Sequence, residues 1–223
     1  YQIVKDIWIR QAQGRLLSSL SVRPRVVCDP ARFGDDETVI YYAETTNILD
    51  QKIGGQTSVV QVASDLMDMS NKHNNCPIVV EEDGVGGGVI DNLNAKGKAP
   101  KVFRANGKAN NSERFGNQRA EAWFGMGKRF SDGLVEFRHK NMSRNDLTTL
   151  INQLTIPRYR LKNGRIFVEN KDDIKKRLGG SPDRGDAYML LDWSYDKVPS
   201  LIGDDIWWDE DEGVPSYEVM SVL

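Results

Sequence analysis

The chain has 223 residues, of which 39% are hydrophobic and 28% charged, with 30 Lys and Arg against 32 Asp and Glu. This length can bury one sizeable core, and no apolar run approaches the roughly 20 residues of a spanning helix, so we expect no membrane-embedded segment. Two cysteines, Cys28 and Cys76, are too few for a disulfide framework or a thiolate zinc site and fit a reducing compartment. The start at Tyr1 has no signal-peptide pattern, and we expect a fragment of a longer protein.

The charges are unevenly distributed along the chain. Residues 101–184 carry 19 basic and 9 acidic residues, which is compatible with a nucleic-acid partner and equally with a solvated face. No basic residue follows Lys197, whereas seven acidic residues do: Asp204, Asp205, Asp209, Glu210, Asp211, Glu212 and Glu218. The sequence therefore predicts a basic middle and an acidic tail.

Hydrophobic spacing predicts the elements of the first half. In order they are a helix over 1–20, strands Arg25–Asp29, Thr38–Ala43 and Asn47–Ile53, a helix over 57–73, strand Pro77–Val80 and a helix over 88–96. The first three strands have short connections, which indicates antiparallel neighbours. The strand at 77–80 is continuously apolar, as expected for a strand buried on both faces.

The second half alternates between helices and short strands. We expect strand Lys101–Arg104, a helix over 112–130, strand Leu134–Phe137, a helix over 144–154, a hairpin of Arg158–Leu161 and Arg165–Glu169, a helix over 171–178 and a last helix opened by Ser181-Pro182. The pattern predicts an α/β fold, a mixed sheet with helices on both faces.

Acidic residues at element ends are the candidate chemistry. Asp29 follows Val26-Val27-Cys28, and Glu81 follows Ile78-Val79-Val80, both in strands that should be central. A carboxylate there is costly unless it is paired or holds a cation. Asp183 and Asp186, three residues apart, share one face of the last helix. If these groups converge, they form an oxygen-rich site suited to Mg²⁺ or Mn²⁺.

Simpler interpretations exist for each acid. Asp29-Pro30 is also a common turn start, Asp183 also suits a helix N-terminus, and the run 81–83 could be a solvated strand end. Other chemistries lack support: the two histidines have no ligand or triad spacing, the glycines at 84–88 miss the third dinucleotide-fingerprint position, and no phosphate-binding P-loop motif is present.

Several segments together resemble the nuclease domain of the large terminase subunit of tailed bacteriophages. Val27–Val39 resembles the first nuclease motif and Val80–Val89 the second. Arg119–Trp123 looks like the long central helix, and the run from Glu169 to Ala187 resembles the third motif and its lead-in. The likeness extends over about residues 25–195 in one order, which makes it more specific than any single motif.

The resemblance implies a ribonuclease-H-like fold with an auxiliary β-hairpin. The chain would divide into an N-terminal helix and linker (1–24), the nuclease domain (25–198) and an acidic tail (199–223). The implied activity is a metal-dependent endonuclease that cuts concatemeric viral double-stranded DNA during genome packaging in the host cytoplasm, largely without sequence specificity. Two Mg²⁺ or Mn²⁺ ions would activate water and stabilise the leaving oxygen.

The resemblance also implies site residues and partners. Asp29, Glu81 and Asp186 would be catalytic metal ligands, with Asp183 as an auxiliary ligand; a one-residue slip of register leaves Glu82 open as an alternative to Glu81. Implied partners are double-stranded DNA, a packaging ATPase domain of the same protein, the small terminase subunit and the portal protein. The portal would bind residues 200–223, where Trp207-Trp208 lies among acids.

Two alternatives stay open at this point. The same fold serves other nucleases such as resolvases, so a different phosphoryl-transfer enzyme is one. The other is a non-catalytic docking module of the packaging motor that retains the carboxylates. For the tail, the alternative to portal docking is that its tryptophans fold back on the domain.

Overall fold

A five-stranded sheet forms the centre of the computed structural model, which describes residues 1–17, 20–31, 36–139 and 141–200. Its strands are β1 (Arg25–Asp29), β2 (Thr38–Ala43), β3 (Ile48–Gly54), β4 (Ile78–Glu81) and β5 (Lys101–Phe103), in the order β3-β2-β1-β4-β5. The pairs β1–β2 and β2–β3 are antiparallel, whereas β1–β4 and β4–β5 are parallel. The predicted mixed α/β sheet is confirmed.

Strand β1 lies at the middle of this sheet and is buried along its whole length. Its side chains alternate between two cores: Val27 packs on one face, while Val26 and Cys28 pack on the other. This two-sided burial explains the apolar runs Val26-Val27-Cys28 in β1 and Ile78-Val79-Val80 in β4. Each of these strands ends in a carboxylate, Asp29 and Glu81, so the two acids emerge at one edge of the sheet.

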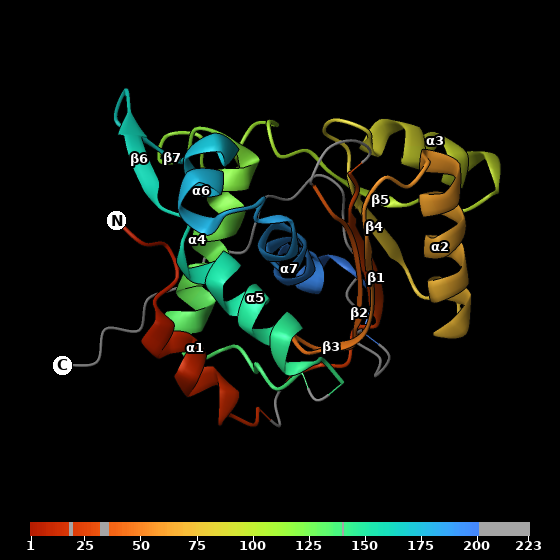
Figure 1. The fold of residues 1–223 in the computed structure, drawn as a ribbon, viewed down its shortest axis with the longest axis horizontal. Helices are drawn as coiled ribbons and strands as arrows, with labels where there is room; N and C mark the ends of the chain where they lie inside the picture. The colour runs from red at the N-terminus through yellow and green to blue at the C-terminus, as the bar shows by residue number, and fades with distance from the viewer. Residues whose placement is uncertain (18–19, 32–35, 140, 201–223) are drawn as a thin grey trace.

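Helices cover both faces of the sheet, as predicted (Figure 1). Helices α2 (Val59–Lys72) and α3 (Gly86–Ala95) cover one face. The other face carries α4 (Gln118–Ser131), α5 (Arg144–Thr155) and α7 (Asp183–Ser194). Helix α7 passes between the sheet and the other two helices, and ten of its twelve residues are buried. Gly185 permits this position, since a Cβ there would come within 2.9 Å of the carbonyl oxygen of Gln153 in α5.

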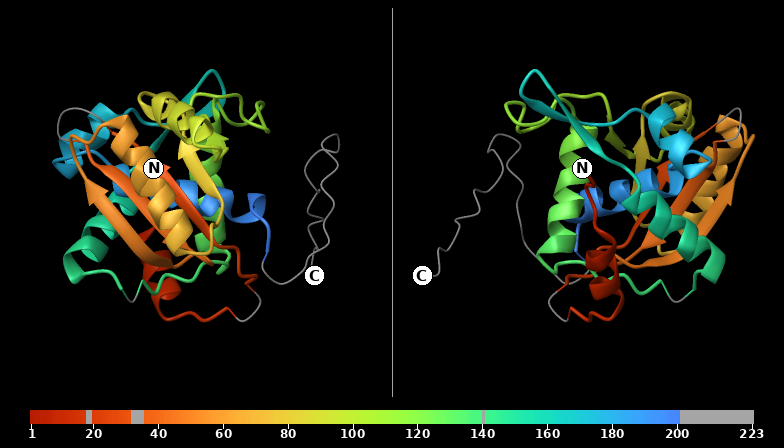
Figure 2. Two further views of the ribbon diagram at one scale, coloured as in Figure 1. Left: turned by 90° about the vertical axis from the view of Figure 1, so that its right-hand side faces the viewer. Right: turned by 60° about the vertical axis from the view of Figure 1, so that its left-hand side comes forward.

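A two-stranded hairpin, β6 (Tyr159–Lys162) with β7 (Arg165–Val168), projects from the helical side (Figure 2). Its turn residues Asn163 and Gly164 both have positive φ, 51° and 75°, as a two-residue hairpin turn requires. Helix α6 (Lys171–Leu178) follows, capped by Asn170 and closed by Gly179, and a short 3-10 turn (Tyr195–Lys197) follows α7. The predicted auxiliary hairpin is therefore present.

Three predicted elements differ from the structure. The first helix is α1 (Asp6–Gln13), much shorter than 1–20, and Ile9 on α1 joins the core beside α4. The long helix begins at Gln118 rather than 112, because residues 114–116 pair instead with Ile166 of β7. The segment 134–137 is not a strand: Glu136 N–H donates to Thr46 Oγ1 at 3.0 Å and Phe137 N–H donates to Ala12 O at 3.1 Å, so its bonds do not follow a strand ladder.

Two further expectations remain predictions. The division at residues 24 and 198 has no independent support, and the tryptophans and acids of the tail lie outside the described residues. Within the described ranges, no helix is both long enough and apolar enough to cross a bilayer.

Candidate metal centre

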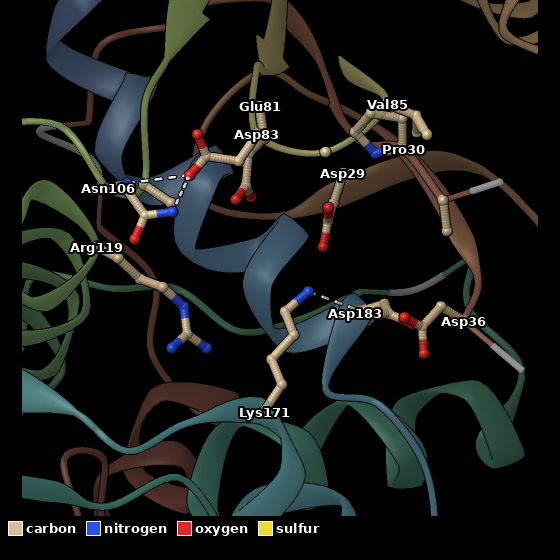
Figure 3. Close-up of a pocket in the computed structure, with 13 residues that line it drawn as sticks. Asp29, Pro30, Asp36, Glu81, Asp83, Val85, Asn106, Arg119, Lys171 and Asp183 are labelled. Atoms are coloured by element: carbon tan, nitrogen blue, oxygen red, sulfur yellow. Dashed lines mark hydrogen bonds and ion pairs between the residues drawn. The ribbon is translucent and has the colours of Figure 1, made fainter. Parts of the chain in front are cut away.

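A cavity of about 480 Å³ opens at the edge of the sheet where β1 and β4 end (Figure 3). Five carboxylates line it: Asp29 from β1, Glu81 from β4, Asp83 just after β4, Asp36 from the approach to β2 and Asp183 from α7. Asp186 lies beneath them, 1% exposed. The structure therefore brings together the acids that the sequence places at three separate element ends.

Asp29 is a buried carboxylate with an unpaired oxygen among the described residues. Its side chain is 7% exposed, and Oδ2 is buried without a hydrogen-bond partner among the described residues. Burial raises the pKa of Asp29 well above its ordinary value, and the nearby carboxylates of Glu81 and Asp186 raise it further, against the opposing charge of Lys171. A buried carboxylate oxygen with no donor is a group that a cation would stabilise.

Glu81 lines the same cavity, while its neighbour Glu82 does not. Burial, assisted by Asp186, raises the pKa of Glu81 to about 7. Glu82 instead pairs with the guanidinium of Arg104, whose Nη2 lies 3.1 Å from Oε1. A Cβ at Gly86 would fall 1.8 Å from the carbonyl oxygen of Glu81, so only glycine lets α3 begin directly against the end of β4. The glycine cluster thus has a packing role at the site.

Asp186 is held by a buried ion pair that the sequence does not reveal. Arg119 of α4 donates through Nη2 to Oδ1 at 3.0 Å and to Oδ2 at 3.2 Å, and Trp123 Nε1 donates to Oδ1 at 2.9 Å. Burial opposes ionisation, but Arg119 and Lys171 outweigh it and lower the pKa of Asp186. This carboxylate is therefore an anion with a fixed orientation.

Asp183 has hydrogen bonds to both oxygens. Ser181 Oγ donates to Oδ1 at 2.6 Å, and the backbone N–H of Glu37 donates to Oδ2 at 2.8 Å. Burial nevertheless raises the pKa of Asp183.

The neighbouring residue Arg184 donates hydrogen bonds to both Glu37 and Asp146, at 2.8 and 2.6 Å. These bonds join the segment before β2 and the start of α5 to the first turn of α7.

Lys171, the first residue of α6, places its ammonium among these acids (Figure 3). Its Nζ lies 3.6 Å from Asp183 Oδ1 and 3.7 Å from Asp186 Oδ2. Burial disfavours the charged form, but the carboxylates of Asp29, Asp186 and Asp183 outweigh it and raise the pKa of Lys171. The chain itself thus supplies a cation to the cluster.

The donor set fits a hard divalent cation in chemistry but not in present geometry. Across the described segments, no three His, Cys, Asp or Glu side chains stand in metal-holding arrangement. The reason is visible: Arg119 engages Asp186, two donors engage Asp183, and Lys171 stands between them. Asp29 and Glu81 keep carboxylate oxygens available, and oxygen-only donors are what Mg²⁺ and Mn²⁺ prefer.

Sequence reasoning missed Arg119, Trp123 and Lys171 as site residues. Arg119 and Trp123 are four apart and therefore share a helix face, which is a usable signal only when the facing carboxylate is known. Lys171 follows β7 by three residues, in a stretch rich in both charges.

The fold is the one seen in solved nuclease domains of large terminase subunits. No family model and no curated protein sequence matches the chain. Among solved structures, it is similar to the nuclease domain of the large terminase subunit of bacterial virus Sf6, at 18% identity and a TM-score of 0.73, covering 86% of this chain and 98% of that one. A lysine-to-alanine variant of that Sf6 domain, solved with calcium, gives 0.74 at 18% identity, covering 86% and 99%.

A second similar structure is the large terminase nuclease of the thermophilic phage G20c with bound magnesium. Its identity is 13% and its TM-score 0.59, with coverage of 83% of this chain and 94% of that chain. At identities this low, the similarity establishes the shared fold alone. The activity of this chain must therefore be argued from its own site.

Proposed function

We propose that this chain is a divalent-cation-dependent endonuclease that hydrolyses phosphodiesters of double-stranded DNA, largely without sequence preference. The observation that carries the proposal is the buried Oδ2 of Asp29, which has no hydrogen-bond partner among the described residues and lies at a cavity that Glu81, Asp183 and Lys171 also line. The fold shared with nuclease domains solved with calcium and magnesium supports it. Asp29, Glu81 and Asp186 are the proposed catalytic residues, and Asp183 is the proposed auxiliary ligand.

The proposed chemistry divides between the cofactor and the chain. A pair of Mg²⁺ or Mn²⁺ ions supplies activation of water and neutralisation of the oxyanions that develop in hydrolysis. Asp29 and Glu81 would hold these ions, Asp29 through an Oδ2 that has no hydrogen-bond partner among the described residues, and Arg119 fixes the orientation of Asp186. Lys171 is 40% exposed, so its ammonium can leave the cluster toward solvent when divalent cations enter.

The likeness to these nuclease domains supports a proposal for the biological setting. We propose that the domain cuts concatemeric viral DNA during genome packaging in the host cytoplasm, working with a packaging ATPase domain of the same protein and the small terminase subunit. Residues 200–223 are the proposed contact with the portal protein. Removal of this segment should leave plasmid nicking intact or increased and eliminate capture of the chain by portal rings; a truncated chain that still binds the rings as well would refute that role.

The proposed activity is tested by incubating supercoiled plasmid with the purified chain and Mg²⁺, Mn²⁺ or EDTA. We expect nicked and linear products with either metal, none with EDTA, and end positions spread over the plasmid. Cleavage that persists in EDTA, or ends confined to one sequence, would contradict the proposal.

One observation favours a second candidate, the non-catalytic docking module. Lys171 already neutralises the carboxylates, so the cluster could be a structural ion network. Such a module would bind neither Mn²⁺ nor plasmid productively, and titration calorimetry with Mn²⁺ would show no saturable heat. A resolvase, another nuclease of this fold, would instead prefer branched junctions over linear duplex in the same cleavage assay.

A further inference from the structure

The hairpin β6–β7 carries a concentration of positive charge on one face. In its register Lys162 stands directly opposite Arg165, and Arg160 stands opposite Phe167. Directly opposed residues share a face, and so do residues two apart, which puts Arg160, Lys162 and Arg165 together. Within the described part of the chain, none of these three side chains has an acidic partner.

The opposite face of the hairpin is the one that packs inward. Tyr159, Ile166 and Val168 contact the main core, whereas Leu161 near the tip of the same face is 69% exposed. Along the base of the hairpin the basic face is therefore the one turned away from the core. Arg160 and Lys162 are exposed, and Arg165 is partly exposed. Like charges placed directly opposite each other destabilise a strand pair, so this arrangement costs stability unless an anion binds to it.

The hairpin is held in place rather than free to swing. Gly116 N–H donates to Ile166 O at 2.9 Å, and Ile166 N–H donates to Arg114 O at 2.8 Å, which adds the segment 114–116 alongside β7. The ring of Phe167 lies over Gly116, where even a Cβ would come within 1.9 Å of it. An anchored hairpin presents its three cations in a fixed pattern.

The base of the hairpin is joined to the candidate metal centre. The guanidinium of Arg119, which holds Asp186, also donates through Nη1 to the carbonyl oxygen of Glu169 at 3.4 Å, directly after β7. Lys171 follows two residues later. From Val168 to Arg165 the strand extends roughly 10 Å outward. Figure 1 shows the hairpin beside α6.

We infer that the basic face of the hairpin, Arg160, Lys162 and Arg165, binds phosphates of the DNA duplex flanking the cleaved bond. The inference rests on the proposed function, because a duplex is taken as the substrate. A duplex carries one phosphate charge per roughly 1.7 Å of its axis, so three cations on a short ribbon match several neighbouring phosphates. The contact is to the backbone and therefore positions DNA without reading its sequence.

Fluorescence anisotropy tests the inference with a labelled random-sequence duplex in EDTA, over a series of salt concentrations. The combined variant Arg160→Gln, Lys162→Gln, Arg165→Gln should bind about tenfold more weakly, and the slope of log K against log salt should fall by about 2 to 3. The control variant Lys5→Gln, Lys96→Gln, Arg144→Gln removes three exposed cations elsewhere on the surface and should bind as the wild type does.

A folding measurement separates binding from damage. Because the substitutions remove like-charge repulsion, the melting temperature of the hairpin variant should be unchanged or higher. An unchanged affinity and salt slope would overturn the inference and would show that the charges only protect the free edge of β6 from pairing. Equal losses in both variants would overturn it too, since the binding would then follow net charge.

Plasmid cleavage and duplex binding, measured together, test the nuclease activity and the hairpin surface separately. A wild-type chain that binds duplex through the hairpin but never cuts plasmid supports the surface and refutes the nuclease. A wild-type chain that cuts plasmid, with a hairpin variant that binds as tightly, supports the nuclease and refutes the surface.

Discussion

Arg119 and Asp186 form a buried, doubly hydrogen-bonded ion pair between α4 and α7, with Arg119 13% and Asp186 1% exposed. The pair joins α4 and α7, which lie on the same face of the sheet, next to the candidate metal centre. Because removing one partner of such a pair leaves an uncompensated charge, its integrity should matter for stability as well as for the site.

Substituting Arg119→Gln should therefore destabilise the protein by about 3 to 5 kcal/mol at pH 8. At lower pH the loss of unfolding free energy should be smaller, since Asp186 can then take up a proton and become neutral. Urea unfolding at pH 8 and pH 5 measures both effects. Arg10→Gln, which breaks the exposed pair with Asp6, should cost less than about 1 kcal/mol; equal costs for the two variants would contradict the account.

Lys171 competes with divalent cations in this account. Lys171→Gln should lower the melting temperature without metal, because the carboxylates lose their neutralising ammonium, and should enlarge the rise in melting temperature on adding Mn²⁺. Thermal melts with and without Mn²⁺ check this, with Lys176→Gln as the control because its side chain is 77% exposed. A smaller Mn²⁺ effect in Lys171→Gln would show that the lysine assists binding instead.

Substitution of Glu81 should reduce the rate of plasmid nicking far more than substitution of its neighbour Glu82. Glu81→Gln should abolish metal-dependent plasmid nicking, since its carboxylate lines the cavity, whereas Glu82→Gln loses only a partly exposed pair with Arg104. Initial nicking rates of the two variants in Mg²⁺ decide the order. The reverse order would mean that the ligand comes from the other face of β4.

His139 should make stability fall at acid pH. It is 4% exposed, its Nδ1 accepts from Ile48 N–H at 2.9 Å, and burial lowers its pKa to about 3. The unfolded chain therefore binds a proton below pH 6.5 that the folded chain refuses, and stability is lost as pH falls from 6.5 toward 3.

The variant His139→Asn, which keeps an acceptor near Nδ1, isolates this effect. It should be less stable than the wild type at pH 7, where the ring packs against Phe137 and Tyr188. The difference should shrink by about 2 to 3 kcal/mol at pH 4.5. Denaturant titrations across this pH range test it, and a constant difference would mean that His139 is not kept neutral by the fold.

The sheet was predictable because its strands carry local signals. Burial on both faces gives β1 and β4 an apolar run of three residues each, and an acid ends each run. The segment 134–137 misled for the opposite reason. Val135 and Phe137 are buried, but Phe137 N–H donates to Ala12 O and Glu136 N–H donates to the side chain of Thr46, and no local pattern encodes these bonds.

The acidic half of the site was predictable and the basic half was not. Asp29 and Glu81 stand out because a carboxylate after a buried strand is unusual. Arg119 and Lys171 come from α4 and α6, and nothing local distinguishes them from the other basic residues of 101–184. Their roles arise only when tertiary packing brings both side chains to the carboxylates of α7, which is also why the ion pair of Arg119 with Asp186 was not predicted.

The measurement that tests the account most directly is plasmid nicking by Asp29→Asn in Mg²⁺ or Mn²⁺, beside Asp68→Asn, an exposed aspartate of α2. Asp29→Asn should lose cleavage while its melting temperature holds or rises without metal, because burial makes the ionised carboxylate unfavourable. Asp68→Asn should cut as the wild type does. Undiminished cleavage by Asp29→Asn would contradict the assignment of the candidate metal centre.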